Sequence, residues 1–218
     1  MNVRPASDIR QGGAAASPSY GSRMERLILA RHAESVFNEA GVLNGDPSTP
    51  GGLTERGRDQ ARRLGAMIAD DPIDLCITTA FQRTRETADV ALSGRTVPRI
   101  EIPELDDPPN GDFELRPYEE LTAWRATNGP DVPIPGVGIP ERALVLRMLM
   151  GVDLLIARPE PTVFVIAHGW FVAWILGAAT SGAHPNEGPP GHAIAHRISR
   201  PDIARASAEL REDPYRYA

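Results

Sequence analysis

Short, continuous apolar runs recur along the chain, separated by stretches in which apolar residues follow helical spacing. Runs of this kind are typical of strands that are buried on both faces of a sheet. We expect strands at residues 27–30, 75–78, 97–102 and 162–167, and a weaker one within 192–198.

The stretches between these runs predict helices. After Thr54, a candidate N-cap, apolar or small residues recur every three or four positions. The same spacing predicts helices over 55–69, 83–92, 118–126, 142–157 and 170–179. Strands that alternate with helices favour an α/β fold, here a three-layer sandwich with a mostly parallel central sheet flanked by helices.

Proline and glycine mark the segments that interrupt this pattern. Pro98 falls within the third run, which places that strand at an edge of the sheet. Residues 103–140 are rich in proline and glycine around one short helix, as expected of a cap insertion in a single domain covering 24–218. Residues 1–23 lack any apolar block, so they predict a disordered leader, a cloning remnant or an overcalled start that precedes Met24.

Composition narrows the function classes. The net charge of −6 argues against nucleic acid or an anionic membrane as the main partner, and no apolar run approaches the roughly 20 residues of a bilayer span. The only cysteine, Cys76, lies in an apolar run and is expected to be a buried small hydrophobe. Without a disulfide framework, the cytoplasm is the expected compartment. No feature predicts a homo-oligomer.

All 23 basic residues are arginines. The absence of lysine excludes a Schiff base to pyridoxal phosphate and a P-loop lysine, and no other cofactor is indicated. Arginine suits planar, bidentate capture of phosphate or carboxylate groups.

Histidine and arginine follow the buried runs where a site is expected. The first run ends in Arg31-His32, the long run 162–167 is followed by His168, and run 75–78 leads into a helix that begins near Arg83. Open α/β sheets bind ligands at the carboxyl ends of their strands, and a helix that begins there turns its N–H groups toward an anion. Arg85, two residues after Arg83, is expected to be a solvated helix residue.

These residues belong to motifs that resemble a known family. The stretch R-H-A-E-S-V-F-N at 31–38 resembles the R-H-G-E-S-x-x-N signature of the histidine phosphatase superfamily, also called phosphoglycerate-mutase-like. Asn44-Gly45 and residues 53–61 follow, the latter similar to L-T-x-x-G-x-x-Q-A. Residues 79–88 resemble S-x-L-x-R-A-x-x-T-A, 105–114 resemble L-x-E-x-x-x-G-x-W-E, and 167–169 resemble S-H-G.

The resemblance implies a metal-independent phosphatase acting on a small phosphorylated molecule. His32, kept neutral, would attack phosphorus and carry the phosphoryl group. Asp107 would protonate the leaving oxygen, for which its pKa must be raised. Arg31, Arg83 and His168 would be catalytic too, since they would bind the equatorial phosphate oxygens and stabilise the charge of the transition state. The substrate-binding residues would be Arg31, Asn38, Asn44, Gly45, Arg83 and His168.

Several positions depart from the family pattern. Ala33 replaces a glycine, and an aspartate stands where many relatives have glutamate, which leaves Glu104 as a rival acid. Mutases of the family place an arginine next to the acid and use a lysine further along. Pro108 and the absence of lysine therefore favour hydrolysis over phosphoglycerate-type mutase activity. A catalytically silent relative that binds phosphorylated ligands is a further alternative.

The other histidines give weaker signals. His192 and His196 are four positions apart, but no cysteine or carboxylate completes a ligand set, so we expect solvent-facing residues and no metal. His184 lies in a Gly/Pro-rich loop and indicates nothing. Trp170 is equally consistent with a pocket wall and with the core.

The cap segment bears on the substrate. Between Glu104 and Glu120 seven acidic residues stand against one arginine, Arg116. If these carboxylates roof the pocket, they disfavour a second anionic group and favour a sugar or cyclitol monophosphate, with Asn110, Tyr118 and Trp124 as contacts. The alternative is that most of them face solvent.

Overall fold

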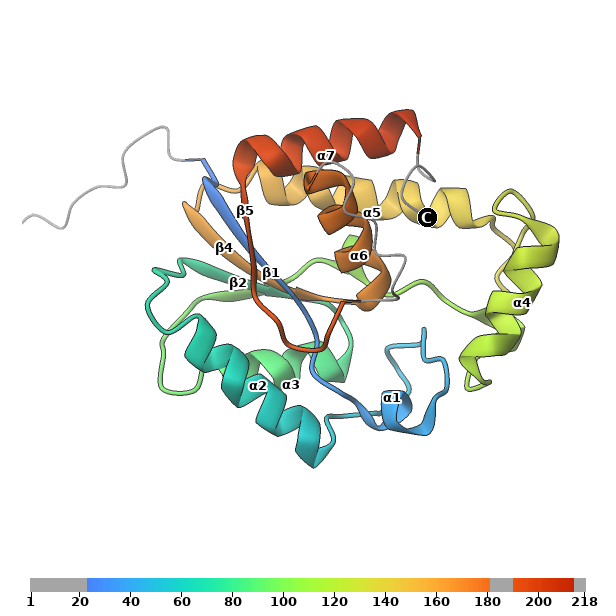
Figure 1. The fold of residues 1–218 in the computed structure, drawn as a ribbon, viewed down its shortest axis with the longest axis horizontal. Coiled ribbons are helices and arrows are strands. Elements are labelled where there is room, and N and C mark those ends of the chain that lie inside the picture. The colour runs from blue at the N-terminus through green and yellow to red at the C-terminus, as the bar shows by residue number, and fades with distance from the viewer. Residues whose placement is uncertain (1–22, 181–189, 214–218) are drawn as a thin grey trace, which may run out of the picture.

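The computed structural model describes residues 23–180 and 190–213 and contains a five-stranded sheet in the order β3-β2-β4-β1-β5 (Figure 1). Its strands are β1 (Arg26–Arg31), β2 (Leu75–Thr78), β3 (Arg99–Glu101), β4 (Thr162–Ala167) and β5 (His196–Ser199). Three of the four pairings are parallel, and β5 alone runs antiparallel, against β1. The expected mostly parallel α/β sandwich is confirmed.

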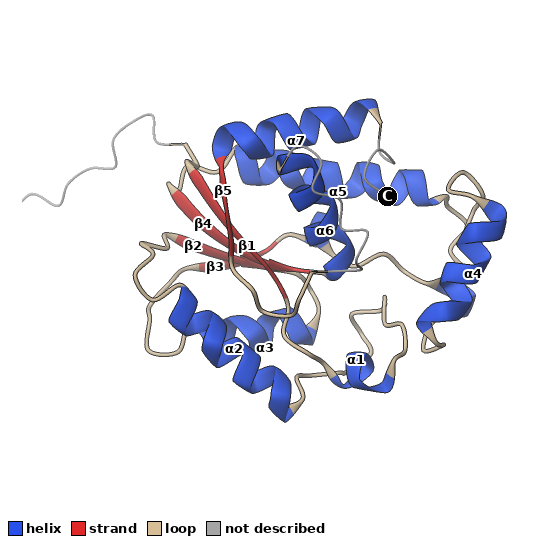
Figure 2. Ribbon diagram, viewed as in Figure 1, coloured by secondary structure: helices blue, strands red, loops and turns tan. Residues whose placement is uncertain are grey.

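Helices cover both faces of the sheet (Figure 2). The helices are α1 (Val36–Ala40), α2 (Glu55–Met67), α3 (Gln82–Ala91), α4 (Tyr118–Asn128), α5 (Glu141–Ile156), α6 (Gly169–Ala179) and α7 (Arg200–Glu212). In Figure 1, α2 and α3 lie below the sheet, while α5, α6 and α7 lie above it.

The alternation of side chains along β1 explains these layers. Leu27 and Leu29 enter one core cluster, with residues of α5, α6 and α7. Ile28 and Ala30 enter the other, with residues of α2 and α3. Because both faces of the strand are buried, its sequence is a continuous apolar run.

The expected elements agree closely with the observed ones. The strand expected at 97–102 is β3, which begins directly after Pro98 and lies at the edge of the sheet, and Cys76 is buried within β2. Burial raises the pKa of the Cys76 thiol to about 12, which keeps it protonated. The expected leader lies outside the described residues except Arg23, as does His184.

Helix α7 was not predicted. Its signals are present: Ser199 caps it by accepting from the Asp202 N–H, and Ile203, Ala206 and Leu210 are buried on one face. The helix begins directly after β5, without a loop between the two elements.

Residues 103–140 form an irregular segment with little regular structure besides α4. Two single 3-10 turns, η1 (Pro103–Leu105) and η2 (Gly111–Phe113), precede α4. Figure 1 places α4 at one end of the molecule, beyond the sheet. Among the helices described between residues 23 and 213, none has the length and apolar character that a membrane span needs.

The turn after β1 is held by the two helices below the sheet. The Ala33 N–H donates to Thr87 Oγ1 at 3.0 Å, and the Glu34 N–H donates to Gln60 Oε1 at 2.8 Å. The Glu34 carbonyl accepts from the Thr54 N–H at 3.1 Å. The side chain of Ala33 packs into the core cluster on this face.

Gly57 lets α2 approach this turn closely, so replacing it with alanine should destabilise the protein. A Cβ at position 57 would lie 2.0 Å from the Glu34 carbonyl oxygen, where backbone must move. We expect Gly57→Ala to lower the free energy of unfolding by about 1–3 kcal/mol, measured by urea denaturation. The control Arg63→Ala, exposed on the same helix, should change it by less than about 0.5 kcal/mol. Equal stabilities would contradict the close approach.

Candidate active site

The carboxyl ends of β1, β2 and β4 meet at one cavity of about 410 Å³. His32 directly follows β1, and its N–H donates to the Ala167 carbonyl of β4 at 2.9 Å. His168 follows β4, and Arg83 lies in the first turn of α3. Of the residues expected at the site, the cavity wall includes Arg31, His32, Asn38, Asn44, Arg83 and Asp107. His168 lies directly behind this wall, fully buried.

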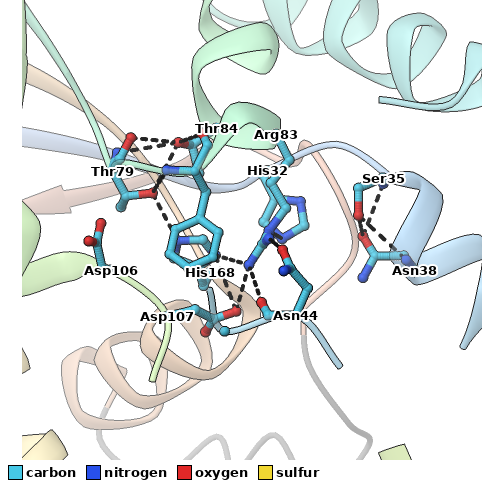
Figure 3. A network of polar contacts seen from close by, with 12 residues as sticks. His32, Ser35, Asn38, Asn44, Thr79, Arg83, Thr84, Asp106, Asp107 and His168 are labelled. Atoms are coloured by element: carbon cyan, nitrogen blue, oxygen red, sulfur yellow. Dashed lines mark hydrogen bonds and ion pairs between the residues drawn. The ribbon is translucent and has the colours of Figure 1, made fainter. Parts of the chain in front are cut away.

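Arg83 connects these residues through its guanidinium group (Figure 3). Its Nε–H donates to His32 Nε2 at 3.1 Å, and its Nη2–H groups lie 3.1 Å from His168 Nδ1 and 2.9 Å from Asp107 Oδ2. Asn44 accepts from Nη1 at 2.6 Å and, through its carbonyl, from Nη2 at 3.1 Å. The Phe81 ring packs 4.1 Å from the guanidinium carbon. The charge is therefore buried, but each of the three guanidinium nitrogens has at least one hydrogen-bond partner.

These contacts define the tautomer of His32. Its Nδ1 lies 2.8 Å from the Ala33 carbonyl oxygen, which can only accept, so Nδ1 carries the proton. Nε2 then has a lone pair, consistent with the donor Arg83 Nε–H that faces it. The unprotonated nitrogen, which can act as a nucleophile once the Arg83 Nε–H is released to phosphate, thus belongs to a residue of the cavity wall.

Burial and positive charge keep both histidines neutral. The pKa of His32 lies well below its ordinary value because of burial and, next, the charges of Arg83 and Arg31. The pKa of His168 is lowered well below its ordinary value by burial and by Arg83. A neutral imidazole is the form that can attack phosphorus.

Asp107 has the opposite shift. Burial raises its pKa above the ordinary value, against the opposing charges of Arg83 and Arg31. The side chain is 27% exposed to the cavity, and Oδ2 lies 3.3 Å from His168 Nδ1. A raised pKa and access to the cavity are what a proton donor needs.

Asp106 and Arg147 hold the acidic segment in place. Asp106 Oδ1 accepts from the Ala80 N–H at 2.8 Å, and its carbonyl accepts from Arg147 Nη2. Glu104, the rival acid, lies in η1 and is not part of the cavity wall. The structure therefore brings Asp107, and not Glu104, to the histidines.

The segment at residues 190–192 contacts both Arg31 and His32. Arg31 Nη1 donates to the Pro190 carbonyl at 3.1 Å, and its buried Nε has no partner among the described residues. His192 Nδ1 lies 2.9 Å from the His32 carbonyl oxygen, and the two rings are 5.6 Å apart. The expectation that His192 faces solvent is wrong, because this contact holds it against the turn. His196 is only partly exposed, and its Nε2 is buried.

Asn38, Asn44 and Gly45 line or border the cavity but are already hydrogen-bonded. Asn38 Oδ1 accepts from the Ser35 N–H at 3.0 Å, and its Nδ2 donates to the Tyr118 hydroxyl at 3.1 Å. Asn44 orients Arg83, as described above. The Gly45 N–H donates to Glu114 Oε1 at 2.9 Å.

Glu114 was not singled out by the sequence analysis. Besides Gly45, it accepts from Asn110 Nδ2 at 3.0 Å and Asn44 Nδ2 at 3.3 Å. The carboxylate thus joins the turn at 44–45 to the cap segment. Its signal was its place as the last residue of the 105–114 motif.

Aromatic and apolar side chains form much of the remaining wall. They are Phe37, Leu43, Tyr118, Leu121, Trp170, Ala173 and Trp174. Of the seven acidic cap residues only Asp107 lines the cavity, so the acidic roof is wrong. Of the other six, Asp112 and Glu119 are exposed and the remaining four are partly buried, so the solvent-facing alternative fits only some of them. Trp124 packs against Phe113 outside the wall, whereas Trp170 both lines the cavity and packs on the core. Arg85 is half exposed and pairs with Glu101, as expected.

Within residues 23–180 and 190–213, no group of three or more His, Cys, Asp or Glu side chains is placed to hold a metal ion. The positive charge near His32 comes from arginine.

Comparison with known proteins defines the family. The family model "Histidine phosphatase superfamily (branch 1)" matches residues 27–211. The chain therefore belongs to this superfamily, as its motifs indicated.

Individual relatives fall into more than one group. An adenosylcobalamin/alpha-ribazole phosphatase of Salmonella typhimurium is 40% identical over 121 residues, 52% of this chain and 59% of that protein. The chain is thus matched to little more than half the length of that relative. A "Probable phosphoglycerate mutase GpmB" of Erwinia tasmaniensis is 29% identical over 71% of this chain and 76% of its own length. The solved alpha-ribazole phosphatase of Shigella flexneri superposes with a TM-score of 0.66, at 26% identity over 80% of this chain and 90% of its own.

The buried neutral histidines should make the protein acid-sensitive. The unfolded chain binds protons at histidine below a pKa of about 6.5, whereas folded His32 and His168 resist protonation, so stability falls as the pH drops below that value. Each histidine contributes up to about 1.4 kcal/mol per pH unit. The raised pKa of Asp107 acts in the opposite direction, in the pH range between its ordinary value near 4 and its raised value in the folded protein.

Urea denaturation at pH 7, 6 and 5 measures this effect. The slope of unfolding free energy against pH should be shallower in His168→Gln than in the unmodified protein. Equal slopes would show that His168 does not stay neutral in the folded state.

Proposed function

We propose that the protein is a phosphomonoester hydrolase that forms a phosphohistidine intermediate at His32. The observation that supports this most strongly is that Nε2 of His32, a residue of the cavity wall, is the unprotonated ring nitrogen and accepts from Arg83 Nε–H. Arg31, Arg83 and His168 bind the equatorial phosphate oxygens and stabilise the charge that the transition state spreads over them.

The reaction takes place in two steps. Nε2 of His32 bonds to phosphorus while the phosphorus–oxygen bond to the leaving group breaks, and the leaving oxygen takes the proton of Asp107. Asp107, now a carboxylate, then accepts a proton from water as the water oxygen attacks phosphorus and the bond to Nε2 breaks. Free phosphate leaves, and His32 and Asp107 regain their starting protonation states.

Hydrolysis is favoured over phosphoryl transfer back to the substrate. A mutase must hold the dephosphorylated product by a second charged group. The cavity wall contains Arg31, Arg83 and Arg125, and Arg125 is the one not assigned to the phosphate. Its Nε lies 3.0 Å from Glu141 Oε2, and its guanidinium carbon lies 5.8 Å from the centre of the Trp170 ring, so it already has partners. A catalytically silent relative is expected to lack one of the catalytic residues. This chain retains all four of His32, His168, Arg31 and Arg83, which argues against that alternative.

The enzyme is proposed to work without a metal, because two arginines and a histidine supply the charge that a metal would otherwise provide. The buried, protonated Cys76 suits the reducing cytoplasm expected from the sequence.

The cavity wall indicates a leaving group with two kinds of surface. Asn38, Asn110 and Tyr118 offer polar contacts of the kind that hydroxyl groups take, as expected for a sugar or cyclitol monophosphate. Trp170 and Leu121 offer a flat apolar surface that a bare sugar does not fill. We therefore propose a sugar-type monophosphate that carries a flat apolar group.

Replacement of His32 tests the intermediate. Rapid acid-free quenching with ³²P-labelled substrate should give base-stable, acid-labile label on His32, and His32→Ala should abolish both label and turnover. His196→Gln, a histidine on β5 outside the cavity, should keep both. Turnover in the presence of excess chelator should be unchanged. Label on another residue, or turnover of more than a few per cent in His32→Ala, would overturn the mechanism.

A substrate panel tests the leaving group. The specificity constant kcat/KM should be at least tenfold higher for alpha-ribazole 5′-phosphate and nucleoside monophosphates than for 3-phosphoglycerate and sugar bisphosphates. Trp170→Ala should reduce this preference by roughly 3–10-fold, the size of one aromatic contact. Trp124→Ala removes a tryptophan outside the cavity and should leave the preference unchanged. Higher rates on the most anionic compounds would contradict this proposal.

A further inference from the structure

Two buried hydroxyl groups lie behind His168, on the side of its ring away from Asp107 (Figure 3). Thr79 follows β2 and Thr84 lies in the first turn of α3, and both are fully buried. Thr79 Oγ1 lies 2.9 Å from His168 Nε2 and 3.0 Å from Thr84 Oγ1. The three groups form a hydrogen-bonded chain that leads away from the cavity.

The direction of this chain follows from counting its protons. Thr84 Oγ1 lies 2.8 Å from the Phe81 carbonyl oxygen and 3.2 Å from the Thr79 carbonyl oxygen. Carbonyl oxygens only accept, so the single hydroxyl proton of Thr84 points to them. Thr79 must then donate its own proton to Thr84 Oγ1. What Thr79 offers His168 is a lone pair, and Nε2 of His168 therefore carries a proton.

A second contact supports the same assignment from the other side of the ring. Arg83 Nη2 lies 3.1 Å from His168 Nδ1, and a guanidinium group only donates. Nδ1 is therefore unprotonated in the empty site. His32 and His168 are opposite tautomers, and each turns its lone pair to Arg83.

An unprotonated phosphate oxygen that reaches His168 is repelled by the lone pair on Nδ1. His168 must gain a proton at Nδ1 to bind phosphate, and it must keep the proton on Nε2 while doing so. Charged and titratable groups face the ring from β1, α3, α5 and the acidic segment, namely Arg31, His32, Arg83, Asp107 and Arg147. The cations among them oppose this proton until the negative charge of the phosphate is present.

We propose that Thr84, acting through Thr79, is a positioning residue that keeps Nε2 of His168 protonated and so lets Nδ1 take a proton from the arriving phosphate. The phosphate enters as its protonated anion, its O–H bond breaks, and the Nδ1–H bond forms, with no other reactant. This inference rests on the proposed function, since it assigns a role within the same phosphate site.

Thr84 stands at the position where the motif that residues 79–88 resemble has alanine. Without it, Thr79 is free to rotate its proton toward Nε2. That orientation favours the neutral form with Nδ1–H facing the oxygen Oδ2 of Asp107, and it disfavours the doubly protonated ring. Thr84 therefore matters for phosphate binding although it does not touch the cavity.

The test is ¹⁵N-histidine NMR on the full chain, with His168 assigned by comparison with His168→Gln. In the unmodified protein Nε2 should be protonated and Nδ1 unprotonated, and saturating inorganic phosphate should protonate both. In Thr84→Ala the Nε2–H fraction should fall, and the affinity for inorganic phosphate should drop about tenfold, the size of one buried hydrogen bond. Thr84→Ser should restore both properties.

Thr180→Ala is the matched control, because Thr180 makes the same kind of bond, to the Leu176 carbonyl at 2.7 Å, at the opposite end of α6 from His168 and outside the cavity wall. It should behave as the unmodified protein. Nδ1–H in the empty unmodified protein would overturn the proposal, and this measurement needs no variant to fold. Unchanged tautomer and phosphate affinity in Thr84→Ala would overturn it as well. If the tautomers are as expected but no monoester is hydrolysed, the proposed function fails while the role of Thr84 stands.

Discussion

The site depends on one buried guanidinium placed between two neutral imidazoles and a carboxyl group. Burying a charge is costly unless hydrogen bonds replace its hydration. Arg83 meets this condition with His32, His168, Asp107 and both oxygens of Asn44. Because the guanidinium donates only, it selects the tautomer of each ring that it contacts.

The surrounding chain serves to hold that group in place. The turn at Asn44-Gly45 presents its oxygens to Arg83, and Glu114 fixes that turn from the cap. Asp106 and Arg147 hold Asp107 against the guanidinium from the other direction. Segments far apart in the sequence thus meet around a single side chain, which explains why the motifs are spread over most of the chain.

The sequence was sufficient for the strands, most helices and the residues at strand ends, because continuous apolar runs and the ends of parallel strands are local features. Contacts between distant segments were not accessible in this way. The bond from His192 to the His32 carbonyl depends on where the chain returns after α6, and the clamp by Glu114 depends on how the cap folds. The number of acidic residues in the cap predicted an acidic pocket roof, which is wrong for the same reason. Composition does not say which carboxylates face a cavity.

The exclusive use of arginine has a consequence for how this site responds to its surroundings. Burial lowers the pKa of Arg31 and Arg83, yet arginine starts from so high a value that both keep their charge. A lysine buried in the same place could lose its proton and with it the field that keeps the imidazoles neutral. The electrostatic frame of the pocket is thus constant across the physiological range of acidity, and the groups that change charge within it are the ones that carry protons during turnover.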